Sequence, residues 1–203
     1  MINRRIFLLS STTAAALAQS PSDRVTLGLI GAGGRGRRVM TEFKRDPDLK
    51  VHAVCDVYEP NLESGLSAAG PGTKAYRNYK QLLDDKDIDA VLIATPEHWH
   101  HRMTLDAMAA GKDVYVEKPL CHTPEQGREL VEAQRSSDRI VQVGMQRRSY
   151  NLYQEARDLR REGRLGTVRM VRTYWLNSRT VPRRAEFKGP IDWDQWVGPA
   201  PKT

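Results

Sequence analysis

A glycine-rich turn between an apolar segment and a helical pattern constrains this chain more than any other feature. Residues 25–30 form an apolar run typical of a buried strand, and Gly31, Gly33 and Gly36 follow with the spacing Gly-x-Gly-x-x-Gly. The first glycine allows a tight turn, the second lets the backbone approach an anion, and the third lets helix and strand pack closely. The helix that follows would offer free N–H groups and its positive dipole end to a pyrophosphate. This stretch therefore predicts a dinucleotide site.

The acid that would complete such a site follows the next strand. Residues 49–55 have the pattern of a second strand, which ends at Asp56, about 20 residues beyond Gly36. A carboxylate there can accept hydrogen bonds from an adenosine ribose diol. Asp56 favours NAD over NADP because it would repel a 2′-phosphate, although Arg35 or Arg37 could offset that repulsion.

Composition excludes several other classes of protein. The 203 residues carry a formal charge of +7, but the basic residues are scattered and do not form one tract, so we expect no nucleic-acid partner. Two cysteines, Cys55 and Cys121, do not make a disulfide framework and are interpreted as buried small side chains.

Residues 1–18 have the character of an export signal. Arg4 and Arg5 precede a short apolar segment, and the Ala-Leu-Ala ending at Ala18 matches a cleavage site. The arginine pair resembles the twin-arginine signal, from which this chain departs at Asn3 and Leu9. The expectation is a periplasmic or otherwise exported protein without a stable membrane anchor, because the apolar segment is too short to span a bilayer. Since that route carries folded proteins, we expect a tightly held cofactor.

Strand and helix patterns alternate over residues 23–146, which predicts an α/β fold with a doubly wound parallel Rossmann sheet. The run 89–94 is apolar without alternation, as expected for a strand covered on both faces. The predicted strands are 25–30, 49–55, 74–76, 89–94, 113–116 and 140–143, and the predicted helices are 35–45, 59–69, 79–84, 100–110 and 123–136.

The pattern changes after this alternation. Residues 150–161 form a charged helical pattern and 167–176 a long strand pattern, so 147–203 is expected to begin a second, incomplete α+β domain for substrate binding or oligomerisation. A lone strand is unstable, so we expect either that it pairs with another partner or that the chain given lacks the rest of its domain.

Polar segments end the fourth and fifth predicted strands and should meet Asp56 in one cleft. Lys118 follows the fifth strand and is placed to act as a base in hydroxyl oxidation; the alternative is a surface lysine paired with Glu117. His98 and His100 follow the fourth strand and are predicted to contact substrate or nicotinamide, with His100 a catalytic candidate. A metal site at His98, His100 and His101, or a plain helix start, are the alternatives.

These segments together resemble the Gfo/Idh/MocA family of oxidoreductases, named for glucose-fructose oxidoreductase, inositol dehydrogenase and a rhizopine-catabolism protein. The resemblance covers about 25–203 and rests on these motifs: Gly-Leu-Ile-Gly-Ala-Gly-Gly-Arg-Gly at 28–36, Cys-Asp-Val at 55–57, Thr-Pro-Glu-His-Trp-His at 95–100, Glu-Lys-Pro-Leu at 117–120 and Gly-Met-Gln-Arg-Arg at 144–148.

The resemblance implies NAD, or NADP, on the glycine loop, Lys118 as the active-site lysine, a small sugar or polyol substrate and a homo-oligomer for the full-length protein. It also implies an Asp-x-x-x-His helix, which residues 147–203 do not contain. The predicted catalytic residues are Lys118 and His100, no metal is expected, and the predicted cofactor-binding residues are Gly31, Gly33, Gly34, Arg35, Gly36, Asp56, Thr95, Pro96, His98, Glu117 and Gln146.

Three functions remain open on this evidence. The first is an NAD(P)-dependent oxidoreductase that transfers hydride between a sugar or polyol carbon and the nicotinamide. The second is an NAD-dependent glycoside hydrolase resembling α-N-acetylgalactosaminidase, which oxidises its sugar only transiently. The third is a non-catalytic nucleotide-binding remnant.

Overall fold

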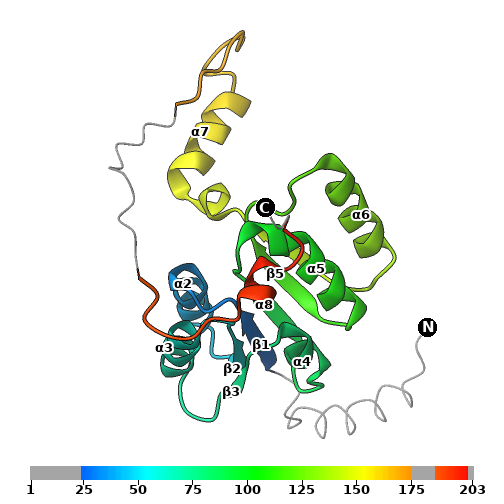
Figure 1. Ribbon diagram of the computed structural model, residues 1–203. Helices are drawn as coiled ribbons and strands as arrows, with labels where there is room; N and C mark the ends of the chain where they lie inside the picture. The colour runs from blue at the N-terminus through cyan, green and yellow to red at the C-terminus, as the bar shows by residue number, and fades with distance from the viewer. Residues whose placement is uncertain (1–23, 175–185, 201–203) are drawn as a thin grey trace, which may run out of the picture.

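A single parallel sheet organises the part of the chain that the computed structural model describes, residues 24–174 and 186–200. Its six strands run in the order β3-β2-β1-β4-β5-β6, so the doubly wound fold is confirmed (Figure 1). The predicted signal at 1–18 lies outside the described residues. The strands are β1 (Val25–Ile30), β2 (Leu49–Cys55), β3 (Lys74–Tyr76), β4 (Ala90–Ile93), β5 (Asp113–Glu117) and β6 (Val141–Gly144).

Helices cover both faces of the sheet (Figure 1). On one face lie α2 (Gly34–Phe43) and α3 (Glu59–Ala69), and on the other lie α4 (Tyr79–Asp84), α5 (His100–Ala109) and α6 (Pro124–Arg135). Each element agrees with the sequence prediction to within two residues at either end. The remaining elements are the 3₁₀ turns η2 (Glu97–Trp99) and η3 (Gln146–Ser149) and the helices α7 (Asn151–Arg161) and α8 (Trp193–Val197).

Two separate hydrophobic cores result, because neighbouring side chains of a strand point to opposite faces. In β1, Leu29 packs into the core beneath α2 and α3, while Ile30 packs into the core beneath α4, α5 and α6. Both side chains are at most 2% exposed. The central strands therefore bury both faces, which is why their sequences read as continuous apolar runs.

Side chains at the start of helix α6 supply partners for its free backbone N–H groups. Helix α6 begins after Thr123, whose hydroxyl accepts a hydrogen bond from the amide of Gln126 at 3.3 Å. The side chain of Gln126 in turn accepts from the amide of His122 at 2.8 Å. This reciprocal arrangement satisfies N–H groups that would otherwise lack partners at the helix start.

The segment after β6 does not follow the sequence prediction throughout. Helix α7 forms, but none of its residues is buried, and Figure 1 shows it projecting from the sheet. The strand predicted over 167–176 is wrong for its described part, since 167–174 is irregular and exposed. No described strand pairs with 167–174, and an extended segment without a paired neighbour is unstable. Positions 175 and 176 lie outside the described residues.

Residues 186–200 return to the sheet. The amide of Asp192 donates to the carbonyl of Val57 at 2.9 Å, and Ile191 forms an antiparallel bridge with Tyr58. This segment, which we call the C-terminal strap, therefore packs on the first domain. Within the described ranges, no helix combines the length and apolar character needed to cross a bilayer.

Candidate dinucleotide and active site

The glycine loop lies at the switch point of the sheet, where the chain order reverses between β1 and β4. Gly31 has φ +90°, and a Cβ there would come within 2.7 Å of the Ala94 backbone. A Cβ on Gly36 would overlap the carbonyl oxygen of Gly31. The first and third glycines are therefore required by close packing within the protein itself, as the motif predicts.

The second glycine is different, because nothing in the protein requires it. A Cβ on Gly33 would meet only the side-chain nitrogen of Asn61, at 3.8 Å, and one on Gly34 would meet nothing within 4 Å. Gly33 also precedes α2 without a capping side chain, and the first turn of α2 carries no acidic residue. Open space beside free helix N–H groups fits the pyrophosphate of a dinucleotide.

Asp56 follows β2 and faces the same loop. Its carboxylate accepts the amide of Ala32 at 2.7 Å and the amide of Tyr58 at 2.9 Å. Burial raises the pKa of Asp56, and these backbone hydrogen bonds oppose the rise without cancelling it. Asp56 thus fixes the glycine loop to β2 and stands where a ribose diol would bind.

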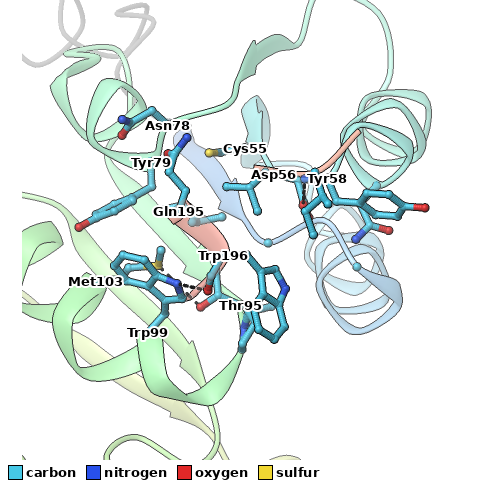
Figure 2. A pocket seen from close by; sticks show the side chains of 18 of the residues that line it. Cys55, Asp56, Tyr58, Asn78, Tyr79, Thr95, Trp99, Met103, Gln195 and Trp196 are labelled. Carbon is cyan, nitrogen blue, oxygen red and sulfur yellow. Dashed lines mark hydrogen bonds between the residues drawn. The ribbon is translucent and has the colours of Figure 1, made fainter. Parts of the chain in front are cut away.

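Two hollows flank the loop, and Ala94 and Thr95 line both of them. The larger has a volume of about 710 Å³ and the smaller about 320 Å³. Figure 2 shows the larger one with Asp56 and Tyr58 on one side and Trp99 on the other. A ligand with two linked halves could occupy both hollows by crossing the open side of Gly33. The smaller hollow is lined by Arg35, Ala94, Thr95, Glu97, His100, Glu117, Lys118 and Gln146.

An ion pair closes the smaller hollow on the side of the glycine loop. Glu117 is 5% exposed and accepts a hydrogen bond from Arg35 at 2.6 Å, and Arg35 also reaches Gln146 at 3.4 Å. Glu117 is thereby committed to Arg35, so the alternative in which Lys118 is a surface lysine paired with Glu117 is wrong. Lys118 is exposed and makes no hydrogen bond or ion pair with any described residue. Its peptide bond to Pro119 is cis.

His100 is not placed to act on a substrate directly. It is 1% exposed, and its ring lies between the carbonyl of Pro119, 2.6 Å from Nδ1, and the carbonyl of Thr95, 3.0 Å from Nε2. A neutral imidazole has one N–H and donates to one of these two carbonyls, while its other nitrogen faces the second. Because the buried ring lies between two backbone segments, we interpret His100 as a positioning residue in place of the predicted catalytic one. It holds the ends of β4 and β5 together beside Lys118.

The geometry of this site can be compared with that of known proteins. A family model described as "Oxidoreductase family, NAD-binding Rossmann fold", that of Gfo/Idh/MocA, matches residues 25–145. The chain belongs to this family. The predicted resemblance is therefore confirmed, and with it the NAD-binding type of the Rossmann domain.

Relatives within the family include enzymes of two kinds. An inositol 2-dehydrogenase from Salmonella paratyphi B is 31% identical over 167 residues, which are 82% of this chain and 48% of that protein. A glycosyl hydrolase family 109 protein from Shewanella sp. ANA-3 is 37% identical over 118 residues, which are 54% of this chain and 26% of that protein. The chain spans about half or less of the length of these curated relatives.

Solved structures of the family agree. The crystal structure of a myo-inositol dehydrogenase from Lactobacillus casei, in complex with NAD(H) and myo-inositol, superposes with a TM-score of 0.64 at 27% identity. The match covers 69% of this chain and 42% of that one.

Most of the residues predicted to bind the cofactor line at least one of the two hollows, whereas Gly34, Gly36 and His98 line neither. Pro96 lines only the larger hollow, and His98 lines neither, because its Nε2 lies 2.9 Å from the carbonyl of Trp196 in the strap. Predicted contact between His98 and the cofactor is therefore replaced by contact with the strap. His101 pairs with Glu129 on α6, at 2.9 Å. His98, His100 and His101 therefore each contact a different partner.

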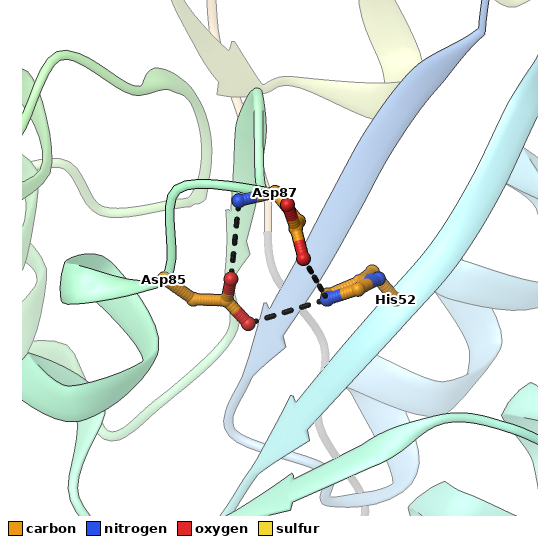
Figure 3. Close-up of side chains that lie close together, drawn as sticks. All are labelled: His52, Asp85 and Asp87. Carbon is orange, nitrogen blue, oxygen red and sulfur yellow. Dashed lines mark hydrogen bonds and ion pairs between the residues drawn. The ribbon is translucent and has the colours of Figure 1, made fainter. Parts of the chain in front are cut away.

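A group of potential metal ligands lies elsewhere, among His52, Asp85 and Asp87 (Figure 3). His52 Nε2 is 3.2 Å from Asp85 and 3.8 Å from Asp87. The ammonium of Lys74 already contacts both carboxylates, at 2.9 and 3.4 Å, and the hydroxyl of Tyr76 donates to Asp85 at 2.8 Å. We interpret this cluster as an ion-pair network that joins β2, β3 and the end of α4, because Lys74 supplies the positive charge a metal would bring.

Sequence reasoning missed the residues that complete the larger hollow. Asn61, on α3, and Asn78, before α4, contribute amide groups, while Gln195 and Trp196 come from the strap. The strap has a recognisable helix signal, since Asp192 caps α8 by accepting the amide of Gln195 at 3.0 Å. That signal predicts a helix but gives no indication of the surface on which the helix lies.

Proposed function

We propose that this protein is an NAD(P)-dependent oxidoreductase that transfers hydride between a sugar or polyol hydroxyl carbon and a tightly held nicotinamide cofactor. One observation carries the proposal: an open glycine loop lies between two hollows, and the smaller one exposes Lys118, which pairs with no residue in the part of the chain that the structure describes. The family membership and the inositol dehydrogenase relatives support it.

Each half of the cofactor would have its own set of residues. Asp56 would accept the hydrogen bonds of the adenosine ribose, and the first turn of α2, beside Gly33, would hold the pyrophosphate. The nicotinamide would then lie in the smaller hollow, against Thr95 and Glu117. NAD is favoured over NADP because Arg35 is engaged by Glu117 and Arg37 by the carbonyl of Ala32 at 2.6 Å, and neither arginine lines the hollow that holds Asp56.

The nicotinamide ring supplies the hydride acceptor or donor when the cofactor is bound. A residue of the chain would transfer the proton of the substrate hydroxyl. Lys118 Nζ, as the free amine, would take the proton of the substrate hydroxyl during oxidation and return it during reduction. The ion pair between half-exposed Arg35 and buried Glu117 would hold one wall of the hollow, and His100 would hold the backbone segments at Thr95 and Pro119, beside Lys118.

The test separates binding from turnover. Titration with NADH measures binding, and a panel of cyclic polyols and hexoses with NAD, followed by NADH absorbance, measures turnover. Lys118→Met should keep NADH affinity within about threefold and lower turnover by about 10²-fold or more, because a positioned acid–base group contributes 10²–10⁴. Lys86→Met, which alters an exposed lysine preceding β4, is the matched control and should change neither quantity.

Two results would contradict the proposal. Failure of the unmodified chain to bind NADH or NADPH would remove the dinucleotide site. Binding without turnover of any polyol or hexose would favour a nucleotide-binding remnant.

A second candidate is favoured by the match to glycosyl hydrolase family 109 proteins. An NAD-dependent glycoside hydrolase would use the same Lys118 and cofactor site, and it would return the hydride before releasing its product. Incubation with an aryl α-N-acetylgalactosaminide separates the two functions. Release of the phenol without net NADH formation supports the hydrolase, whereas net NADH from a free polyol supports the oxidoreductase.

We also propose that the protein is exported by the twin-arginine route and that the full-length protein forms homo-oligomers. The first proposal is supported by Arg4, Arg5 and the Ala-Leu-Ala site in residues 1–18. The second is supported by apolar side chains exposed on α7, among them Leu152, at 63% exposure. Cell fractionation with Arg4→Lys/Arg5→Lys as the export-blocked control tests export, and light scattering of the full-length protein tests assembly.

A further inference from the structure

The C-terminal strap, residues 186–200, crosses the end of the sheet at which the dinucleotide would bind. In Figure 1 it is the red segment that passes over the carboxyl ends of the strands and carries α8. Its two ends attach to different strand-end loops, one after β2 and one after β4. The larger hollow lies between these attachments.

The first attachment is to the loop between β2 and α3. The amide of Asp192 donates to the carbonyl of Val57 at 2.9 Å, and the amide of Glu59 donates to the carbonyl of Pro190 at 3.0 Å. The hydroxyl of Tyr58 accepts the amide of Lys188 at 2.9 Å, and its ring packs edge-on against Phe187. Two of these contacts join backbone to backbone and two use the Tyr58 side chain, and all are made to residues directly after Asp56.

The second attachment is to the loop between β4 and α5. The carbonyl of Trp196 accepts the indole N–H of Trp99 at 3.0 Å and also lies 2.9 Å from Nε2 of His98. Gly198 then lies directly on the Trp99 ring, so closely that a Cβ would overlap the indole, and its φ is +48°. This attachment follows Thr95, which lines both hollows.

Between the attachments, strap side chains form the outer wall of the larger hollow. Gln195 and Trp196 line it together with Gly33 and Asp56, and Figure 2 labels both strap residues at this hollow. The outer surface of the strap is partly exposed, with Trp193 at 48% and Trp196 at 38%. The enclosed volume of about 710 Å³ is within the range of small-molecule sites and suits a nucleoside.

We propose that the C-terminal strap is the retaining wall of the adenosine site, so that the dinucleotide leaves only when one of the two attachments opens. This inference rests on the proposed function, because the retained ligand is the dinucleotide. Gln195 and Trp196 are then adenosine-contacting residues, and His98 and Trp99 are positioning residues that act through the Trp196 carbonyl. The strap thereby accounts structurally for a tightly held cofactor.

The experiment measures release of NADH from the 203-residue chain. NADH is bound first, excess NAD is added, and the loss of bound-NADH fluorescence gives the dissociation rate constant. Gly198→Ala should raise this rate at least tenfold, because the new Cβ pushes the strap off Trp99 and the positive φ disfavours alanine. Trp99→Phe removes the indole N–H donor together with the part of the ring that lies against Gly198, and should raise the rate several-fold.

A matched control separates the strap from a general glycine effect. Gly163 also has a positive φ, +73°, but lies outside the strap and has nothing within 4 Å of its Cβ position. Gly163→Ala should therefore leave the NADH release rate unchanged. Hydrogen exchange is the second measurement: NADH should slow exchange at the Asp192 and Glu59 amides, and Gly198→Ala should reverse that protection.

The outcomes distinguish this inference from the proposed function. If the unmodified chain does not bind NADH, the proposed function fails and the strap inference fails with it. If it binds NADH but Gly198→Ala and Trp99→Phe release it at the original rate, the strap inference alone is overturned. If Gly198→Ala binds NADH faster and more tightly, the strap is a plug that competes with the nucleotide, which also overturns the inference.

Discussion

Gly33 allows the dinucleotide site to be tested without disturbing the fold. Its φ of −62° and ψ of 178° suit any residue, and a Cβ there would meet only Asn61, at 3.8 Å. Alanine at this position gains about 0.4–1 kcal/mol through lower entropy of the unfolded chain. It loses about 0.5–1 kcal/mol as a poorer N-cap than glycine. Gly33→Ala should therefore change the unfolding free energy by no more than about 0.5 kcal/mol.

Binding should respond very differently. The new methyl group would occupy the open side of the loop, where we place the pyrophosphate, and would deny it at least one backbone N–H. A hydrogen bond to a charged group contributes about 1.5–3 kcal/mol, and about 1.4 kcal/mol corresponds to a tenfold change in Kd. Gly33→Ala should therefore weaken NADH binding about 10- to 100-fold.

Thermal unfolding measures the stability of Gly33→Ala, and NADH titration measures its affinity for the dinucleotide. The Tm of Gly33→Ala should stay within about 2 °C of the original, since 1 kcal/mol shifts a domain of this size by about 2–4 °C. Gly36→Ala is the contrasting variant, because its Cβ overlaps the Gly31 carbonyl, and it should lose stability as well as binding. Unchanged NADH affinity in a folded Gly33→Ala protein would refute the placement of the pyrophosphate.

Three further predictions follow from buried titratable groups. Burial alone would raise the pKa of Asp85, but the hydrogen bonds from Lys74, the Asp87 amide and Tyr76 hold it well below its ordinary value. The resulting stabilisation is fully present above about pH 4, the ordinary Asp value, and declines as pH falls toward the folded pKa. Asp85→Asn should cost about 1–2 kcal/mol at pH 7 in urea unfolding, and a gap that does not narrow between pH 7 and pH 2 would contradict this. Burial, followed by the charge of Asp56, raises the pKa of Cys55 to about 12. A thiol reagent should therefore modify Cys55 only at the rate at which the protein unfolds. Rapid labelling of the folded protein would show that Cys55 is not buried. Asp56→Ser should shift the NADP-to-NAD affinity ratio toward NADP by about tenfold, because it removes a carboxylate beside the 2′ position; an unchanged ratio in competitive titrations would mean that Asp56 serves only the loop.

The sequence by itself determined the sheet domain. Apolar runs such as 89–94 give buried parallel strands, and Gly31 and Gly36 stand at positions of the turn where the protein leaves no room for a Cβ. These signals are local, so they can be read without knowing the neighbours. Asp56 and Lys118 were placed correctly at strand ends because all strands of a parallel sheet end at one edge.

Only the tertiary structure decided the partners of these residues. The sequence made His100 a catalytic candidate, but the structure places its ring between the carbonyls of Thr95 and Pro119. The sequence also allowed Glu117 to pair with Lys118, but Glu117 pairs with Arg35. These contacts join residues that are far apart in the chain. A spacing pattern carries no information about them, since they depend on which surfaces meet.

The C-terminal region shows the same division most clearly. The sequence of 167–176 has the pattern of a strand, yet no described strand pairs with 167–174, and this part is irregular. The cap of α8 at Asp192 was readable in the sequence, but the return of the strap to the glycine-loop edge was not. A strand is stable only beside a paired strand, and the position of the strap depends on the surface it packs against. Both therefore depend on long-range contacts that form only when the whole domain packs.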